Sequence, residues 1–139
     1  MSLISMNSIV ELQNMQKSFN IALDKKGFGN FAKNGKKVTI EYTATTFNGT
    51  VVDDSQRHAN EKGQTIIEVG KAEVTECMDE ALRNMSEGAA GTITCPADMA
   101  YGTKMIMPNG PKGLGSISPN STITYKLKVV RIPIIDFLI

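Results

Sequence analysis

The chain has 139 residues, of which 41% are hydrophobic and 21% are charged, and its formal net charge is +1. These values predict one folded domain with its own core and exclude a wholly disordered chain. Without a basic surplus or a long Lys/Arg run, neither nucleic acid nor an anionic membrane is an expected partner. No secretory signal opens the chain and no apolar run reaches the roughly 20 residues that span a bilayer, so we expect a cytoplasmic protein.

The first part of the chain divides into an extension and a strand. Residues 1–17 are expected to form an N-terminal extension, either a short helix with capping-box spacing or a sequence added for expression. Phe19, Ile21 and Leu23 then stand at every second position, which predicts a strand that ends near Gly27.

A hairpin is predicted next. The first strand carries apolar side chains at alternate positions, namely Val38, Ile40, Tyr42 and Ala44. Asn48-Gly49 predicts a type I′ turn, in which both central residues need positive φ, and Val51 starts the return strand. Residues 53–64 are polar without periodicity and predict a surface excursion before a strand at 65–69.

The stretch 69–85 contains the clearest helix. Thr75 is the expected N-cap, and an apolar stripe recurs at helical spacing through Met78, Ala81, Leu82 and Met85. A helix this short is not stable alone, so we expect it to pack on a sheet.

The last third predicts two strands around a long loop. Ile93 and Cys95 face inward on a strand at 92–95, and residues 97–120 form a loop rich in glycine and proline. The final strand alternates clearly, with Ile123, Tyr125, Leu127 and Val129 on one face.

The two cysteines and the C-terminus carry separate predictions. Cys77 and Cys95 are too few for a disulfide framework or a zinc site, so we interpret them as reduced, buried thiols. Residues 132–139 form an apolar tail, predicted to pack on the domain, on the extension at 1–17, or on a partner.

No familiar catalytic constellation is present. His58 is the only histidine, and neighbouring Asp53 and Asp54 point to opposite faces of a strand, so they do not form an acid/base pair. The remaining candidates are three tyrosines, Tyr42, Tyr101 and Tyr125, which predict an apolar cavity with polar tips. Taken alone, a tyrosine of this kind is more often a core residue whose hydroxyl is satisfied.

Residues 35–130 resemble the FKBP-type peptidyl-prolyl isomerases. The resemblance is carried by ordered segments: VTIEYTA and VVDDS, then VGKAEVTECMDEALRNMSEG, then PADMAYG and ISPNSTITYKLKVV. It implies an α+β fold, a half-barrel of five or six antiparallel strands wrapped around one short helix. The isomerase domain would span 18–131, between the extension and the tail.

The resemblance also implies the site and the reaction. The reaction is rotation about X-Pro bonds, with proline-containing peptides or proteins as partners and no metal or cofactor. The catalytic residues would be Asp53, Tyr101 and the backbone N–H of Thr75. Substrate would be bound by Tyr42, Val52, Val74, Met78, Ile117 and Tyr125.

The departures from the family pattern affect the pocket. Val52, Thr65 and Met78 replace residues that are usually Phe, Phe and Trp. The pocket should therefore be less aromatic, with reduced affinity for rapamycin-class macrolides. Two hypotheses remain: an isomerase of low activity that assists protein folding, or a catalytically weak FKBP-like interaction or chaperone domain with a protein partner at its terminal extensions.

Overall fold

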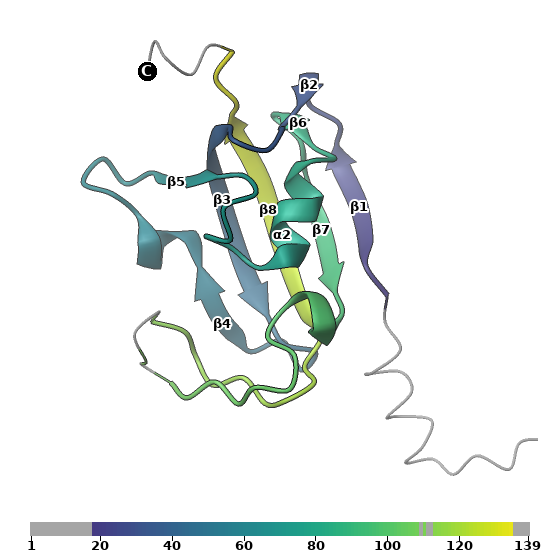
Figure 1. The fold of residues 1–139 in the computed structure, drawn as a ribbon, viewed down its shortest axis with the longest axis vertical. Helices are drawn as coiled ribbons and strands as arrows, with labels where there is room; N and C mark the ends of the chain where they lie inside the picture. Colours follow the sequence, from purple (N-terminus) through teal and green to yellow (C-terminus); the bar gives the residue numbers. More distant parts are fainter. Residues whose placement is uncertain (1–17, 109, 111–112, 135–139) are drawn as a thin grey trace, which may run out of the picture.

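A computed structural model describes residues 18–108, 110 and 113–134. An antiparallel sheet curls around one side of a short helix, α2 (Figure 1). The predicted extension at 1–17 and residues 135–139 of the predicted tail lie outside the described residues. Within the described part of the chain, no helix has the length and apolar character needed to cross a membrane.

Six strands form the main sheet, in the order β1-β7-β8-β3-β4, and β5 also pairs with β3. Their bounds are β1 Asn20–Lys25, β3 Lys37–Thr45, β4 Val51–Asp54, β5 Thr65–Glu68, β7 Ala90–Cys95 and β8 Ile123–Arg131. A separate small sheet and two short 3-10 helices complete the described elements: β2 Phe28–Phe31, β6 Ser86–Glu87, η1 Ser55–His58 and η2 Ala97–Met99. The α+β fold and the six antiparallel strands confirm the prediction, whereas β2 and β6 were not predicted.

The centre of the sheet is the pair β3 and β8. Tyr42 lies opposite Leu127 and Ala44 opposite Tyr125 in the antiparallel register. The predicted alternation is observed, because the inward side chains of both strands are buried and those between them are more exposed. This inner face forms most of the core against which α2 packs.

Helix α2 spans Glu76–Leu82, and its N-cap is Thr75 as predicted. The Thr75 hydroxyl accepts a hydrogen bond from the backbone N–H of Met78 at 3.3 Å. All four residues of the apolar stripe are buried, each at most 1% exposed: Met78, Ala81, Leu82 and Met85. The stripe therefore fixes how the helix sits on the sheet.

The hairpin at Asn48-Gly49 is confirmed, but its predicted turn type is wrong. Gly49 has φ 86°, whereas Asn48 is not among the residues with positive φ. The connection is longer than two residues, with Gly49 N–H donating to Thr46 O and Thr46 N–H donating to Thr50 O. The side-chain oxygen of Asn48 accepts hydrogen bonds from Thr46 Oγ1 and Thr50 N–H. Asn48 therefore stabilises the loop through its side chain and not through a positive φ of its own.

The prediction of two reduced thiols is also wrong. Cys77 on α2 and Cys95 on β7 form a disulfide, with their Cα atoms 5.7 Å apart. Both residues are completely buried, as predicted. The spacing in the sequence gave no sign of this bond because it forms only where the packed helix passes over β7.

The first residues of the predicted tail lie against the domain. Ile132 is half-buried beside the core, and its N–H donates to Glu87 Oε1 at 2.8 Å. The Lys36 ammonium donates to the carbonyls of Pro133 and Ile134 at 2.9 and 3.1 Å. The side chain of Ile132 thus packs on the domain, whereas that of Ile134 is 92% exposed.

Candidate functional site

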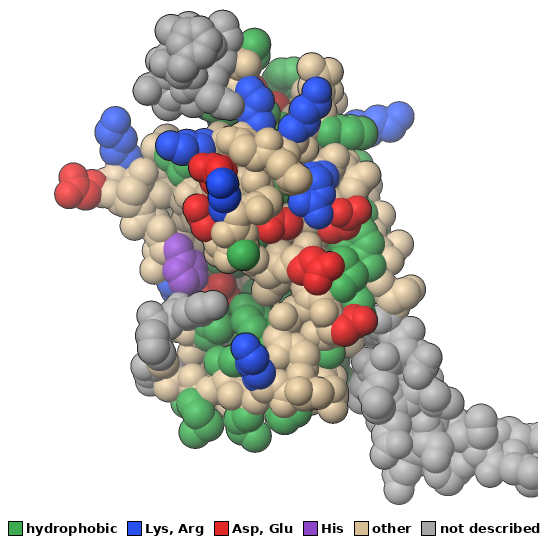
Figure 2. Space-filling view, in the orientation of Figure 1, with side chains coloured by type: hydrophobic (Ala, Val, Ile, Leu, Met, Phe, Trp, Pro, Cys, Tyr) green, Lys and Arg blue, Asp and Glu red, His purple; other side chains and the backbone are tan. Residues whose placement is uncertain are grey.

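A pocket of about 790 Å³ lies between the start of α2, the strands β3 to β5 and the loop that follows η2. Its floor is apolar at Met78, which is 1% exposed. Its rim carries three carboxylates and one lysine, namely Glu73, Glu76, Asp98 and Lys104. Figure 2 shows acidic side chains gathered on this face over α2. The pocket thus combines an apolar floor with a mainly acidic rim.

Asp53 is the central polar group of the pocket. The residue is buried, with only 6% exposed, and each of its two carboxylate oxygens has a hydrogen-bonding partner. Oδ2 accepts a hydrogen bond from the Tyr42 hydroxyl at 2.8 Å, and Oδ1 lies 2.8 Å from Nε2 of His58. The carboxylate lies on β4, the tyrosine lies on β3 and the histidine lies on η1. A buried carboxylate needs such partners, and they hold it in one position.

The three tyrosines surround this carboxylate. The rings of Tyr42 and Tyr125 meet edge to face, with centroids 5.7 Å apart and an interplanar angle of 77°. The Tyr125 hydroxyl shares a hydrogen bond of 3.0 Å with Thr75 Oγ1, which ties β8 to the helix N-cap. Tyr101 lines the same pocket from the loop after η2. All three tyrosines therefore line one pocket, together with apolar and charged side chains.

Electrostatics keep the tyrosines protonated. Burial, and then the nearby charge of Asp53, raise the pKa of both Tyr42 and Tyr101 above the ordinary value. Burial is also the main cause of the raised pKa of Tyr125. Each hydroxyl thus remains available as a hydrogen-bond donor at neutral and mildly alkaline pH.

These shifts predict a loss of stability in alkali. Tyrosines of the unfolded chain ionise near pH 10, while the folded domain retains its protons, so the unfolded state loses protons first and stability falls as the pH rises above about 10. Because the chain has three tyrosines and no tryptophan, ultraviolet absorbance of tyrosinate reports on these three groups alone. We expect native titration well above that of the urea-unfolded chain, and a melting temperature that drops from about pH 10 upward.

The control for this prediction is Tyr125→Phe, which keeps the ring and removes one buried ionisable group. Its melting temperature should depend less steeply on pH in that range. Superimposable titrations of the native and unfolded chains would contradict the prediction.

The structure brings together seven of the nine predicted site residues. The pocket is lined by Tyr42, Asp53, Val74, Thr75, Met78, Tyr101 and Tyr125. Val52 and Ile117 are not among its lining residues. They are 1% and 0% exposed, and each belongs to the packing behind the pocket: Val52 O accepts from Gly115 N–H, and Ile117 pairs with Ile106.

Sequence reasoning missed the contact of His58 with Asp53. In the sequence His58 is a lone histidine in a polar stretch without periodicity; in the structure this part of the stretch folds into η1, with Asp54 as its N-cap. The cap turns the chain so that His58 faces back toward Asp53, five residues earlier. A polar pair at i and i+5 with an N-cap between them is the signal that was available.

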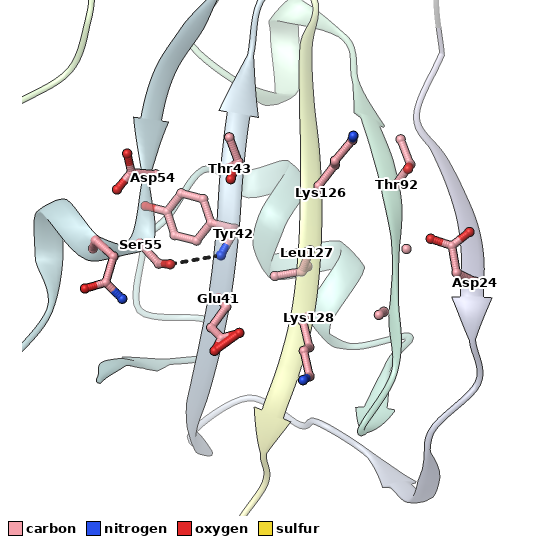
Figure 3. A pocket seen from close by; sticks show the side chains of 13 residues that line it. Asp24, Glu41, Tyr42, Thr43, Asp54, Ser55, Thr92, Lys126, Leu127 and Lys128 are labelled. Carbon is pink, nitrogen blue, oxygen red and sulfur yellow. Dashed lines mark hydrogen bonds between the residues drawn. The ribbon is translucent and has the colours of Figure 1, made fainter. Parts of the chain in front are cut away.

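A second hollow, of about 860 Å³, lies on the outer face of the sheet. Figure 3 shows Lys126 and Lys128 on β8, Glu41 and Thr43 on β3, and Asp24 on β1 pointing to this side. These are the outward positions of strands whose other face is buried. Although it is the larger hollow, it holds none of the convergent tyrosine and carboxylate contacts found in the pocket beside α2.

Comparisons with known proteins agree with this geometry. A family model described as FKBP-type peptidyl-prolyl cis-trans isomerase matches residues 29–130. The chain is 36% identical over 102 residues to the Drosophila melanogaster peptidyl-prolyl cis-trans isomerase Fkbp12, covering 73% of this chain and 85% of that protein. It is 30% identical to an FK506-binding protein of Neisseria meningitidis, covering 78% and 90% of the two chains.

Solved structures show the same fold. The three-domain structure of wheat FKBP73 superposes with a TM-score of 0.72 at 23% identity, covering 84% of this chain and 46% of that one. AtFKBP13 superposes with a TM-score of 0.69 at 21% identity, covering 83% of this chain and 93% of that one.

Proposed function

Because the chain belongs to the family of FKBP-type peptidyl-prolyl cis-trans isomerases and is an enzyme of that class, we propose that the pocket beside α2 is where it accelerates rotation about X-Pro bonds. The observation that supports this site is the buried Asp53 carboxylate, fixed at 2.8 Å by Tyr42 above an apolar floor. Proline-containing peptides or proteins are the proposed substrates.

The pocket offers three contributions to the rotation. The barrier of about 18 to 20 kcal/mol arises from amide resonance, which places negative charge on the carbonyl oxygen of the planar form. An apolar floor withholds water, so this charge-separated form is less well solvated there than in bulk water. The Tyr101 hydroxyl and the Thr75 backbone N–H are the proposed donors to substrate carbonyls. Asp53 keeps neighbouring polar groups oriented, and no covalent step is needed.

The function is tested by NMR exchange spectroscopy on a proline peptide, without a coupled protease. At micromolar protein, exchange between the cis and trans forms should be faster than in buffer alone. An exchange rate equal to the uncatalysed rate would favour the second hypothesis, a binding domain of this family without useful turnover.

We also propose that the pocket binds rapamycin-class macrolides more weakly than an aromatic-lined pocket does. Met78 provides the floor with a flexible thioether side chain, which loses more rotamer entropy on binding than a rigid indole. Val52 is withdrawn into the core and supplies no wall. Together these changes should lower affinity by roughly 10- to 100-fold.

Restoring the aromatic groups should restore affinity. We expect the double variant Met78→Trp and Val52→Phe to bind a macrolide at least about tenfold more tightly, because each ring adds rigid apolar contact area. Isothermal titration calorimetry measures the change. Both positions are at most 1% exposed, so each single variant is melted first to show that the larger side chain is accommodated. Unchanged affinity in folded variants would remove Met78 from the proposed macrolide site.

The cellular location stays a prediction. The sequence predicts the cytoplasm, whereas disulfides persist mainly in oxidising compartments. Thiol labelling of Cys77 and Cys95 in freshly lysed cells, with and without prior reduction, is the measurement that relates the observed bond to the location.

A further inference from the structure

The pocket beside α2 is lined mainly by two runs of the chain that lie apart in the sequence. One run covers residues 72–78 at the start of α2, and the other covers residues 98–104, from within η2 to the loop after it. The first run contains Thr75 and the second contains Tyr101, the two proposed donors to substrate carbonyls. Both donors can act on one peptide only if the two runs keep a fixed relative position.

A disulfide joins these two runs. Of residues 72–78, all but Cys77 line the pocket, and Cys95 lies three residues before Asp98, where the second run begins. Cys77 is bonded to Cys95 on the neighbouring β7 (Figure 1), and both residues are completely buried. The helix therefore turns Cys77 toward β7, while the next residue, Met78, forms the floor of the pocket.

The chain from Cys95 to Tyr101 forms a compact turn. The carbonyl oxygen of Ala97 accepts hydrogen bonds from the backbone N–H groups of Ala100 and Gly102, at 2.9 and 2.7 Å. These two bonds enclose Tyr101 and fix it relative to Ala97, only two residues after the half-cystine. A displacement of Cys95 would therefore be passed on to Tyr101.

The helix that contains Cys77 depends on tertiary bonds for its position. α2 has only seven residues, and so short a helix is not stable alone. Its N-cap is bonded to β8 through the Tyr125 hydroxyl. Within the described part of the chain, no hydrogen bond joins residues 75–82 directly to residues 95–102. The disulfide is thus the direct bond between the two segments that contain the donors.

We propose that the Cys77–Cys95 bond is a positioning cross-link for catalysis, which holds the Thr75 and Tyr101 donors at the spacing required by the twisted amide. This inference rests on the proposed function of the pocket. A misplaced donor loses its hydrogen bond to the transition state. Binding of the planar peptide depends mainly on the apolar floor at Met78, which belongs to one run alone. Loss of the bond should therefore lower kcat and leave KM nearly unchanged.

The experiment measures kcat and KM by NMR exchange for a blocked Leu-Pro peptide, at a temperature where a thermal melt shows every sample to be folded. The oxidised wild type is compared with the protein reduced by a phosphine, which converts the bond into two thiols and is itself oxidised. Because both cysteines are completely buried, reduction is carried out in urea, which is then removed. We expect kcat to fall by roughly tenfold and KM to change by less than about twofold. Reoxidation should restore kcat.

Two variants separate positioning from stability. Cys77→Ala with Cys95→Ala should have the low kcat with and without the phosphine, which excludes a direct effect of the reductant. Val129→Ala is the matched control, because this buried residue lies on β8 beside Ala89, at the end of β7 opposite to Cys95. It should lower the melting temperature and keep the wild-type kcat.

The outcomes distinguish the cross-link from the function. An equal kcat in the folded oxidised and reduced forms, or a change confined to KM, overturns the positioning role and leaves the proposed function standing. An equal fall in kcat for Val129→Ala does the same, because the loss would then follow from stability alone. Absence of acceleration by the oxidised wild type overturns the proposed function itself. If the alanine pair fails to fold, the reduced and reoxidised wild type decide, because they retain both sulfur atoms.

Discussion

Asp53→Asn should lower kcat/KM for a proline peptide by roughly 10- to 100-fold while the domain remains folded. Asparagine has the same shape and still accepts from the Tyr42 hydroxyl, but it removes the buried negative charge. The substitution thus separates the charge of the carboxylate from its hydrogen bonds. NMR exchange gives the rate, and a thermal melt checks the fold.

The neighbouring carboxylate provides a matched control. Asp54 lies on the same strand, but it pairs with Arg57 and caps η1 outside the pocket. Asp54→Asn keeps a good capping residue and should change kcat/KM by less than about twofold. Equal losses in the two variants would contradict a specific role for Asp53.

Reduction of the Cys77–Cys95 bond should lower the free energy of unfolding by about 3 kcal/mol. This value follows from the loop that the bond closes, with a sequence separation of 18 residues. For a domain of this size the melting temperature should fall by roughly 10 °C. Urea denaturation with and without a reductant measures the effect directly.

The double variant Cys77→Ala and Cys95→Ala is the control for the reductant. It should resemble the reduced wild type, except for the small volume lost at two completely buried positions, and a reductant should not affect it. If the wild-type midpoint is the same under both conditions, the bond does not contribute to stability.

Most of the regular structure could be predicted because periodicity reports which faces are buried. The stripe ending at Met85 and the alternation ending at Val129 each require one buried face, and the structure buries both. The small sheet of β2 and β6 was not predicted, because β2 is exposed along its whole length and its sequence has no periodic pattern. The disulfide was not predicted for a different reason, since it depends on where α2 crosses β7 in the folded domain.

Most of the site was predicted through the family resemblance rather than through local sequence patterns. The resemblance assigned Asp53 and Tyr101 to one pocket, and both line it. It also assigned Val52, whose short side chain remains in the core. The contact of His58 could not be predicted from composition, because it depends on the turn that brings the ring back to Asp53.

The pairing of β3 with β8 has a consequence for how this chain folds during translation. Thr45 and Thr124 lie opposite each other although 79 residues separate them in the sequence. Until β8 has emerged from the ribosome, the inner face of β3 and the stripe of α2 lack the strand that joins them to β7. Closing so long a loop is entropically costly, and topologies dominated by such distant pairings fold in milliseconds to seconds. We therefore expect the domain to fold only after synthesis of β8, and arrested nascent chains that stop before residue 123 should remain sensitive to protease.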